Sequence, residues 1–191
     1  HITALTSDKT GNLWIATDGG LQVFNPRMNQ FSNYTKENGK IRTNNITALC
    51  FAKGNKMLIG TSEGLIVMNI STAEMTYLTG NSTSISKFTN NYVTQVFEDS
   101  RGLIWVGTRE GVNILNPTND VLDHLTEKQG LCNNNICGIA EDKNHNVWLT
   151  TSNGVSRVVI QRNHEEGTYN YGLYNYSHTD GLQSDGFNLG A

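Results

Sequence analysis

Short apolar runs alternate with polar, glycine-containing turns along the whole chain. The runs are rich in β-branched and aromatic residues, as in "LWIAT" and "IWVGT", and this composition favours β-strands. No window places its apolar residues at the three- and four-residue spacing of an amphipathic helix. The pattern therefore predicts an all-β protein.

The apolar runs recur in register, which indicates an internal repeat. An aliphatic residue anchors the first run of each unit, and the anchors are Ile2, Ile46, Val93 and Ile136. Successive anchors are 44, 47 and 43 residues apart. Twelve positions after each anchor stands a large residue: Trp14, Leu58, Trp105 or Trp148. Eighteen positions after it stands a glycine: Gly20, Gly64, Gly111 or Gly154.

Each unit predicts four short strands. The first strand holds the anchor, the second holds the large residue, and the third follows the glycine. A weaker fourth strand is expected at residues 31–34, 75–78, 121–125 and 169–176. The second strand is apolar on both faces, so both faces need a covering layer. Neighbouring blades of a β-propeller provide that cover, and a repeat of roughly 40–50 residues with four strands is typical of propellers.

We expect the whole chain, residues 1–191, to form an arc of antiparallel β-propeller blades. The expected repeats are approximately 2–45, 46–92, 93–135 and 136–186. The spacing from Gly130 to Ile136 recurs from Gly181 to Phe187, so a fifth repeat is expected to begin at residue 187. Because propellers close with about four to eight blades, we expect a part of a larger ring. Its apolar end faces would pack against further blades or against a second copy of the chain.

The charge balance narrows the function classes. The chain has 14 Lys and Arg against 17 Asp and Glu, and its net charge is -3. No basic patch suits the neutralisation of phosphates, so we expect no contact with nucleic acid. No stretch approaches the roughly 18 apolar residues of a membrane span. The histidines show no metal-ligand spacing, so we expect neither a metal nor another cofactor.

One motif carries a family resemblance. It comprises Asp8, Gly11, Trp14, Ala16, Thr17, Gly20 and Leu21 in the first unit. It recurs in the third unit as Asp99, Gly102, Trp105, Gly107, Thr108, Gly111 and Val112. The motif closely resembles the two-component regulator propeller repeat. The second unit departs from it with Ala52, Asn55 and Leu58, and the fourth has His145 in the place of the first glycine.

The resemblance implies a function outside catalysis. Such repeats build the periplasmic sensor region of hybrid two-component systems, which are anchored in the inner membrane. It implies a ligand-sensing ectodomain that responds to an oligosaccharide and signals through a histidine kinase elsewhere in a homodimeric parent polypeptide. The shared tryptophans are expected to pack between blades, and the shared aspartates to hold turns.

Ligand-binding residues are therefore expected where the units differ, on loops. The turn between the second and third strands and the connection between units should emerge on the same side of each blade. Their side chains include amides, carboxylates, an arginine and a tyrosine, which suit sugar hydroxyls. The candidates are Glu63, Asn91, Tyr92, Arg109, Glu110, Asn134 and Asn153. For the asparagines, turn and cap formation is the competing interpretation.

Two other functions stay open at this point. A propeller-type lyase or hydrolase would need two carboxyl groups in reach of one bond. Glu63 and Glu110 occupy equivalent positions in adjacent units and could approach each other near the ring axis. A purely structural dimerisation module is the other alternative, because the arc would expose apolar faces.

Overall fold

The computed structural model describes residues 1–80, 88–118, 121–163 and 165–188. These residues form four sheets of four antiparallel strands each, and in every sheet the strand order follows the chain. The predicted all-β blade architecture is confirmed. Two 3-10 helices, η1 (Glu127–Gln129) and η2 (His178–Asp180), lie in connections after the third and fourth sheets and were not expected from the sequence.

Each sheet contains four consecutive strands of the chain. Blade 1 contains β1 (Ile2–Ser7), β2 (Leu13–Thr17), β3 (Gly20–Asn25) and β4 (Gln30–Tyr34). Blade 2 contains β5 (Ile46–Ala52), β6 (Lys56–Thr61), β7 (Gly64–Asn69) and β8 (Met75–Leu78). Blade 3 contains β9 (Val93–Glu98), β10 (Ile104–Thr108), β11 (Gly111–Asn116) and β12 (Val121–Leu125). Blade 4 contains β13 (Ile136–Glu141), β14 (Val147–Thr151), β15 (Val155–Asn163) and β16 (Thr168–Tyr176).

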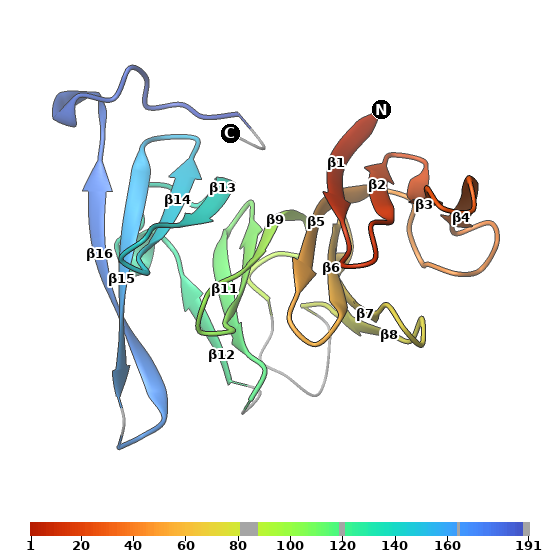
Figure 1. Ribbon diagram of the computed structural model, residues 1–191. Coiled ribbons are helices and arrows are strands. Elements are labelled where there is room, and N and C mark those ends of the chain that lie inside the picture. Colours follow the sequence, from red (N-terminus) through yellow and green to blue (C-terminus); the bar gives the residue numbers. More distant parts are fainter. Residues whose placement is uncertain (81–87, 119–120, 164, 189–191) are drawn as a thin grey trace.

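The blades form an arc (Figure 1). The first strands of successive blades contact one another, β1 with β5, β5 with β9 and β9 with β13, so they line the inner side. The fourth strands lie on the outer side, and β16 and β4 mark the two ends of the arc in Figure 1. Blade 4 differs in size, because β15 and β16 stay paired as far as Asn163 and Thr168.

The small residue two positions after the large one in the second strand has a packing cause. A Cβ added at Gly60 would lie 2.7 Å from Cγ1 of Val93, the anchor of the next blade. A Cβ added at Gly107 would lie 2.7 Å from Cγ2 of Ile136. The small residue of one blade therefore receives the anchor of the next, and a longer side chain would push the two blades apart.

Apolar side chains fill the three junctions between blades. Trp14 packs with Met57 and Ile59 of blade 2 in the first junction. Leu58 packs with Ile104 of blade 3 in the second, and Trp105 packs with residues of blade 4 in the third. Each of the three buried apolar clusters thus spans a junction between blades, and burial of apolar area is the main favourable contribution to folding.

The shared glycine after the second strand is confined by its neighbours. Gly111 has a φ of 105°, and a Cβ there would lie 2.5 Å from the carbonyl oxygen of Leu125. The hydroxyl of Thr108 donates to the Gly111 carbonyl at 2.7 Å and accepts from the Glu110 N–H at 3.1 Å. The same hydroxyl bonds recur at the equivalent threonine of every blade. The motif therefore fixes this turn, because glycine adopts a positive φ without the steric cost that a Cβ would bring.

The shared aspartate also has a structural role. Oδ2 of Asp99 accepts from Nε1 of Trp105 at 3.2 Å, and its Oδ1 accepts from the backbone N–H groups of Arg101 and Leu103, each at 2.9 Å. The tryptophan bond recurs at Asp8 and Asp142. Each carboxylate thus closes the turn and satisfies a tryptophan N–H that packing takes out of water.

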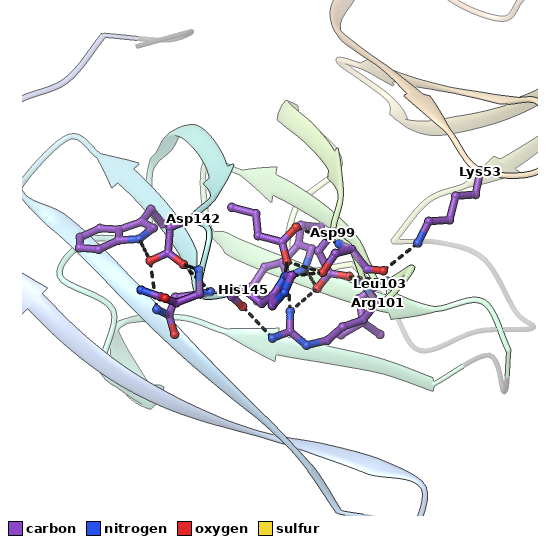
Figure 2. Close-up of polar contacts among 12 residues, drawn as sticks. Lys53, Asp99, Arg101, Leu103, Asp142 and His145 are labelled. Carbon is purple, nitrogen blue, oxygen red and sulfur yellow. Dashed lines mark hydrogen bonds and ion pairs between the residues drawn. The ribbon is translucent and has the colours of Figure 1, made fainter. Parts of the chain in front are cut away.

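Polar contacts tie blade 3 to its neighbours on the side of these turns (Figure 2). The Arg101 guanidinium lies 3.3 Å from Oε1 of Glu141 and donates to the carbonyl of His145 at 2.7 Å, both in blade 4. Nζ of Lys53, in blade 2, donates to the carbonyl of Ser100 at 2.8 Å. Burial raises the pKa of Glu141, but hydrogen bonds from Ser100 and His145 together with the Arg101 charge outweigh it, so the pKa is lowered.

The outer face of blade 1 is apolar and exposed. Leu13 and Phe31 are 37% and 58% exposed, whereas Met57, which stands at the position of Leu13 in blade 2, is fully buried. This face carries the residue types that other blades bury in a junction. We call it the blade-1 end face. At the opposite end of the arc, Trp148 is half-buried and stacks on Tyr176 with ring centroids 5.6 Å apart.

Candidate functional site

The variable turns and connections meet on one side of the arc, as the sequence predicts. The turn after β6 reaches the connection before β5 through a bond from the Ser62 N–H to the Asn45 carbonyl, at 3.2 Å. In blade 4 the Ser152 N–H donates to the Asn135 carbonyl at 3.1 Å. We call this side the loop face. It lies opposite the aspartate turns, because successive strands alternate in direction.

The structure brings two of the predicted residues together on the loop face. The guanidinium carbon of Arg109 lies 3.8 Å from the ring centroid of Tyr92. Arg109 is exposed and Tyr92 is half-buried. The contact is a cation–π stack, which holds the long arginine side chain over the ring. It leaves the N–H groups at the edge of the guanidinium able to donate to a ligand.

The three predicted asparagines lie in turns and connections, where they make hydrogen bonds within the loops. Oδ1 of Asn91 accepts from the Gly80 N–H at 2.6 Å, and Oδ1 of Asn134 accepts from the Glu127 N–H at 2.8 Å. The backbone N–H of Asn153 donates to Thr151 in the repeated turn, at 3.1 Å, and its side chain is exposed. Asn91 and Asn134 thus fix loops, although each side-chain amide keeps donor hydrogens.

Two hollows on the loop face occupy equivalent places in neighbouring blades. The blade-2 hollow has a volume of about 70 Å³, and the blade-3 hollow of about 480 Å³. Glu63 lines the first and Glu110 the second, at the same position of the repeat. The blade-2 hollow is also lined by Arg42, Thr43, Thr61, Gly64, Leu65, Ile66, Tyr77 and Thr79. The blade-3 hollow is also lined by Thr89, His124, Thr126, Lys128, Gln129 and Asn134.

The difference in volume has a visible cause. In blade 2 the guanidinium carbon of Arg42 lies 4.0 Å from the ring centroid of Tyr77, so a stacked pair fills the space. In blade 3 the residue at the place of Tyr77 is His124: Ile66 pairs with Tyr77 across two strands, and Asn113 pairs with His124. The blade-3 hollow is therefore the open and polar member of the pair.

A buried network orients His124 from below. Asn113 is fully buried, and its Oδ1 accepts from the Thr89 N–H at 2.9 Å. The same oxygen lies 2.8 Å from Nδ1 of His124. Because an amide oxygen only accepts, Nδ1 must carry the proton, and Nε2 is left as a hydrogen-bond acceptor. Burial lowers the pKa of His124, which favours this neutral form.

A third hollow, of about 230 Å³, opens on the inner side of the arc. Its lining includes Tyr92, Thr47 and Thr94, together with residues near the start of β1. The buried hydroxyls of Thr47 and Thr94 have no hydrogen-bond partner among the described residues. Neither Glu63 nor Glu110 lines this hollow. The two carboxylates therefore line different hollows, one over each blade.

Among the described residues, no group of histidine, cysteine, aspartate and glutamate side chains is arranged to hold a metal ion. In the same part of the chain, no helix has the length and apolar character needed to cross a lipid bilayer. Three residues that line the blade-3 hollow were not among the sequence candidates: His124, Lys128 and Gln129. The available signal was the pairing of Asn113 and His124, two polar residues at a position where blade 2 has Ile66 and Tyr77.

Comparison with known proteins supports the repeat. The family model of the two-component regulator propeller matches residues 1–19, 87–110 and 130–153. These segments lie in blades 1, 3 and 4 and contain the aspartate turns and second strands. Blade 2, which lacks the aspartate and the tryptophan, is not matched. No curated protein matches the chain by sequence at a significant level.

Solved structures share the fold. The extracellular domain described as the hybrid two-component system BT3049 of B. thetaiotaomicron superposes with a TM-score of 0.78 at 23% identity, over 99% of this chain and 24% of that one. For the corresponding domain of BT4673 the values are 0.68 and 21%, over 93% and 24%. A virginiamycin B lyase from Staphylococcus aureus gives 0.64 at 8% identity, over 90% and 55%.

The chain thus spans about a quarter of the length of the two Bacteroides structures, 24% in each case. At these identities the superpositions establish the fold alone, and the family model adds the repeat. The aspartate turns, the tryptophans and the confined glycines of blades 1 and 3 are the residues that the repeat shares. The protein carries two-component regulator propeller repeats, folded as consecutive four-stranded blades.

Proposed function

We propose that the chain is part of the sensor ectodomain of a hybrid two-component system. The observation that carries the proposal is the match of three segments to the two-component regulator propeller repeat. The structural likeness to extracellular domains of Bacteroides two-component systems agrees with it. The ectodomain lies in the periplasm, and its parent is anchored in the inner membrane and signals through a kinase elsewhere in the polypeptide.

The proposed ligand is an oligosaccharide, bound without turnover at the loop face. Arg109 and Tyr92 offer a stacked pair, and Glu110 and Asn134 line a polar hollow beside it. Sugars are recognised by such mixtures of donors and acceptors around a concave surface. Further blades cover the blade-1 end face, because its exposed leucine and phenylalanine stand where other blades bury apolar residues.

Isothermal titration of the protein against plant and host oligosaccharides tests the proposal. We expect one class of oligosaccharide to bind, and saturating ligand to raise the free energy of unfolding by about 2.7 kcal/mol at a hundredfold excess over Kd. Absence of binding across a broad panel would count against glycan sensing. Hydrolysis or elimination of a bound oligosaccharide, abolished by Glu110→Gln, would instead favour the enzyme alternative.

A further inference from the structure

We propose that the blade-3 hollow is the sugar-binding subsite of this chain, and that it takes one neutral, polyhydroxylated sugar residue. The inference deepens the proposed function, and its ligand class rests on that function. The first support is size. The blade-3 hollow is wide and open to solvent, with about 480 Å³, whereas the blade-2 hollow has only about 70 Å³.

The second support is the repeat itself. Both hollows include the turn after the second strand, the fourth strand and the connection that precedes the blade. In blade 3 the connection after the fourth strand, with Lys128 and Gln129, also lines the hollow. In blade 2 the stack of Arg42 on Tyr77 occupies the space. In blade 3 the corresponding strand position holds His124 over a buried asparagine. Blades 1 and 4 also have polar pairs at this position, Gln22 with Asn33 and Ser156 with Asn175, so the apolar pair of blade 2 is the exception. What distinguishes blade 3 is the imidazole of His124, which lines an open hollow.

The third support is the hydrogen-bonding inventory of the lining. Nε2 of His124 can accept a hydrogen bond, because Nδ1 donates its proton to the amide oxygen of Asn113. Glu110 accepts, and the exposed ammonium of Lys128 donates. Sugar hydroxyls both donate and accept, so they match this mixed set. One carboxylate and one ammonium balance in charge, which favours a neutral ligand over a phosphate or a uronate.

The fourth support is continuity with the stacked pair. Glu110 lines the hollow, and Arg109, which precedes it in the same turn, stacks on Tyr92. A glycan with one sugar unit in the hollow, beside Glu110, could therefore bind Arg109 with its next sugar unit. This turn is held by Thr108 in the same way as in every blade, so its two exposed side chains project from a fixed frame.

The test is a ¹H–¹⁵N NMR titration of the whole chain with glucose, galactose and mannose as probes, followed by calorimetry with the oligosaccharide panel. We expect shifts at residues 110 and 124–134. His124→Phe removes the acceptor, and Lys128→Ala removes the donor at an exposed position that leaves folding unchanged. Each variant should weaken binding by about tenfold, the equivalent of about one hydrogen bond. Tyr77→Phe, at the same position of blade 2, is the matched control and should bind normally.

The outcomes separate this inference from the proposed function. If an oligosaccharide binds but neither variant weakens it, or if the shifts fall on the third hollow, on the inner side of the arc, the subsite is wrong and glycan sensing stands. If monosaccharides shift the blade-3 hollow but no oligosaccharide binds, the subsite stands and glycan sensing fails. If no probe causes shifts in the hollow and no oligosaccharide binds, both are wrong.

Discussion

Blades 2 and 3 adjoin each other and share strand order and register, yet only blade 3 has the aspartate and tryptophan of the repeat. Leu58 and Trp105 stand at the same position, and both are fully buried in a junction. Ala52 replaces Asp99, and Asn55 takes a φ of 57° where Gly102 has 90°. The comparison shows that a blade needs buried apolar volume and a left-handed turn at these positions. The hydrogen bond from tryptophan to aspartate is an addition to that requirement.

The same two blades differ on the loop face, outside the motif. Blade 2 closes its hollow with an arginine–tyrosine stack, and blade 3 keeps the hollow open above a buried asparagine and histidine. The family model matches a segment of blade 3 and none of blade 2. The side chains that distinguish the two hollows lie outside the shared motif.

The largest expected effect comes from truncating the large buried residue of the second and of the third junction. Trp105→Ala should lower the free energy of unfolding by about 3–5 kcal/mol, because it leaves a cavity and takes a donor away from Asp99. Leu58→Ala leaves a smaller cavity with no polar partner, and its loss should fall at the lower end of about 2–5 kcal/mol. Urea unfolding of both variants measures the difference. Equal losses would mean that the tryptophan bond contributes nothing.

The next effect isolates the carboxylate. Asp99→Ala leaves the N–H groups of Trp105, Arg101 and Leu103 without their acceptor, and should cost about 1–3 kcal/mol. The reciprocal change, Ala52→Asp, should destabilise blade 2, because its carboxylate would be buried beside Leu58. Adding Leu58→Trp should recover part of that loss. Urea denaturation of the single and double variants measures the free energies of unfolding. If the changes of the two single variants simply add in the double variant, the aspartate and the tryptophan do not interact.

An acid titration tests the equivalent carboxylate of blade 1, that of Asp8. Burial raises the pKa of Asp8, but hydrogen bonds from Trp14, Thr10 and Asn12 outweigh it and lower the pKa from 3.8 to about 2. A folded-state pKa below the unfolded value means that the carboxylate stabilises the fold above pH 3.8. This contribution is lost as the pH falls from 3.8 towards about 2. Asp8→Asn should show a flatter stability curve across this window than the parent; parallel curves would contradict the assignment.

A smaller effect is expected from the contacts between blades 3 and 4. Arg101→Ala removes an ion pair with Glu141 and a bond to the His145 carbonyl. The Arg101 side chain is 23% exposed, so solvent screens the pair and we expect a loss of about 1 kcal/mol. Arg27→Ala, at an exposed position of blade 1, is the control and should change stability little. A loss no larger than that of the control would show that the Arg101 contacts do not stabilise the junction between blades 3 and 4.

The smallest expected effect lies on the loop face. Tyr92→Leu removes the ring under Arg109 and should cost at most about 1 kcal/mol, the range of an exposed cation–π contact. Thermal unfolding measures this loss. A loss as large as that of Leu58→Ala would show that Tyr92 serves packing rather than the loop face.

The fold was predictable because its determinants are local. The threonine that holds the turn and the glycine after it lie three residues apart, and the aspartate and the tryptophan lie six apart, so regular spacing reveals them. The stack of Arg109 on Tyr92 joins two residues that were already candidates. The blade-3 hollow was not predictable in this way. It depends on the pairing of Asn113 with His124 and on Thr89, 24 residues before Asn113 in another connection.

The blade-1 end face has a consequence for how the array unfolds. Blades 2 and 3 each share two junctions, whereas blades 1 and 4 each share one among the described residues. In a linear array, stability is approximately a sum of intrinsic and nearest-neighbour terms. Fraying should therefore begin at the terminal repeats, and amides of β1 should exchange with solvent faster than their counterparts in β9. A blade added at that face would contribute one stabilising junction, at the cost of ordering its own residues. Closing a ring would contribute a further junction without ordering any additional residues.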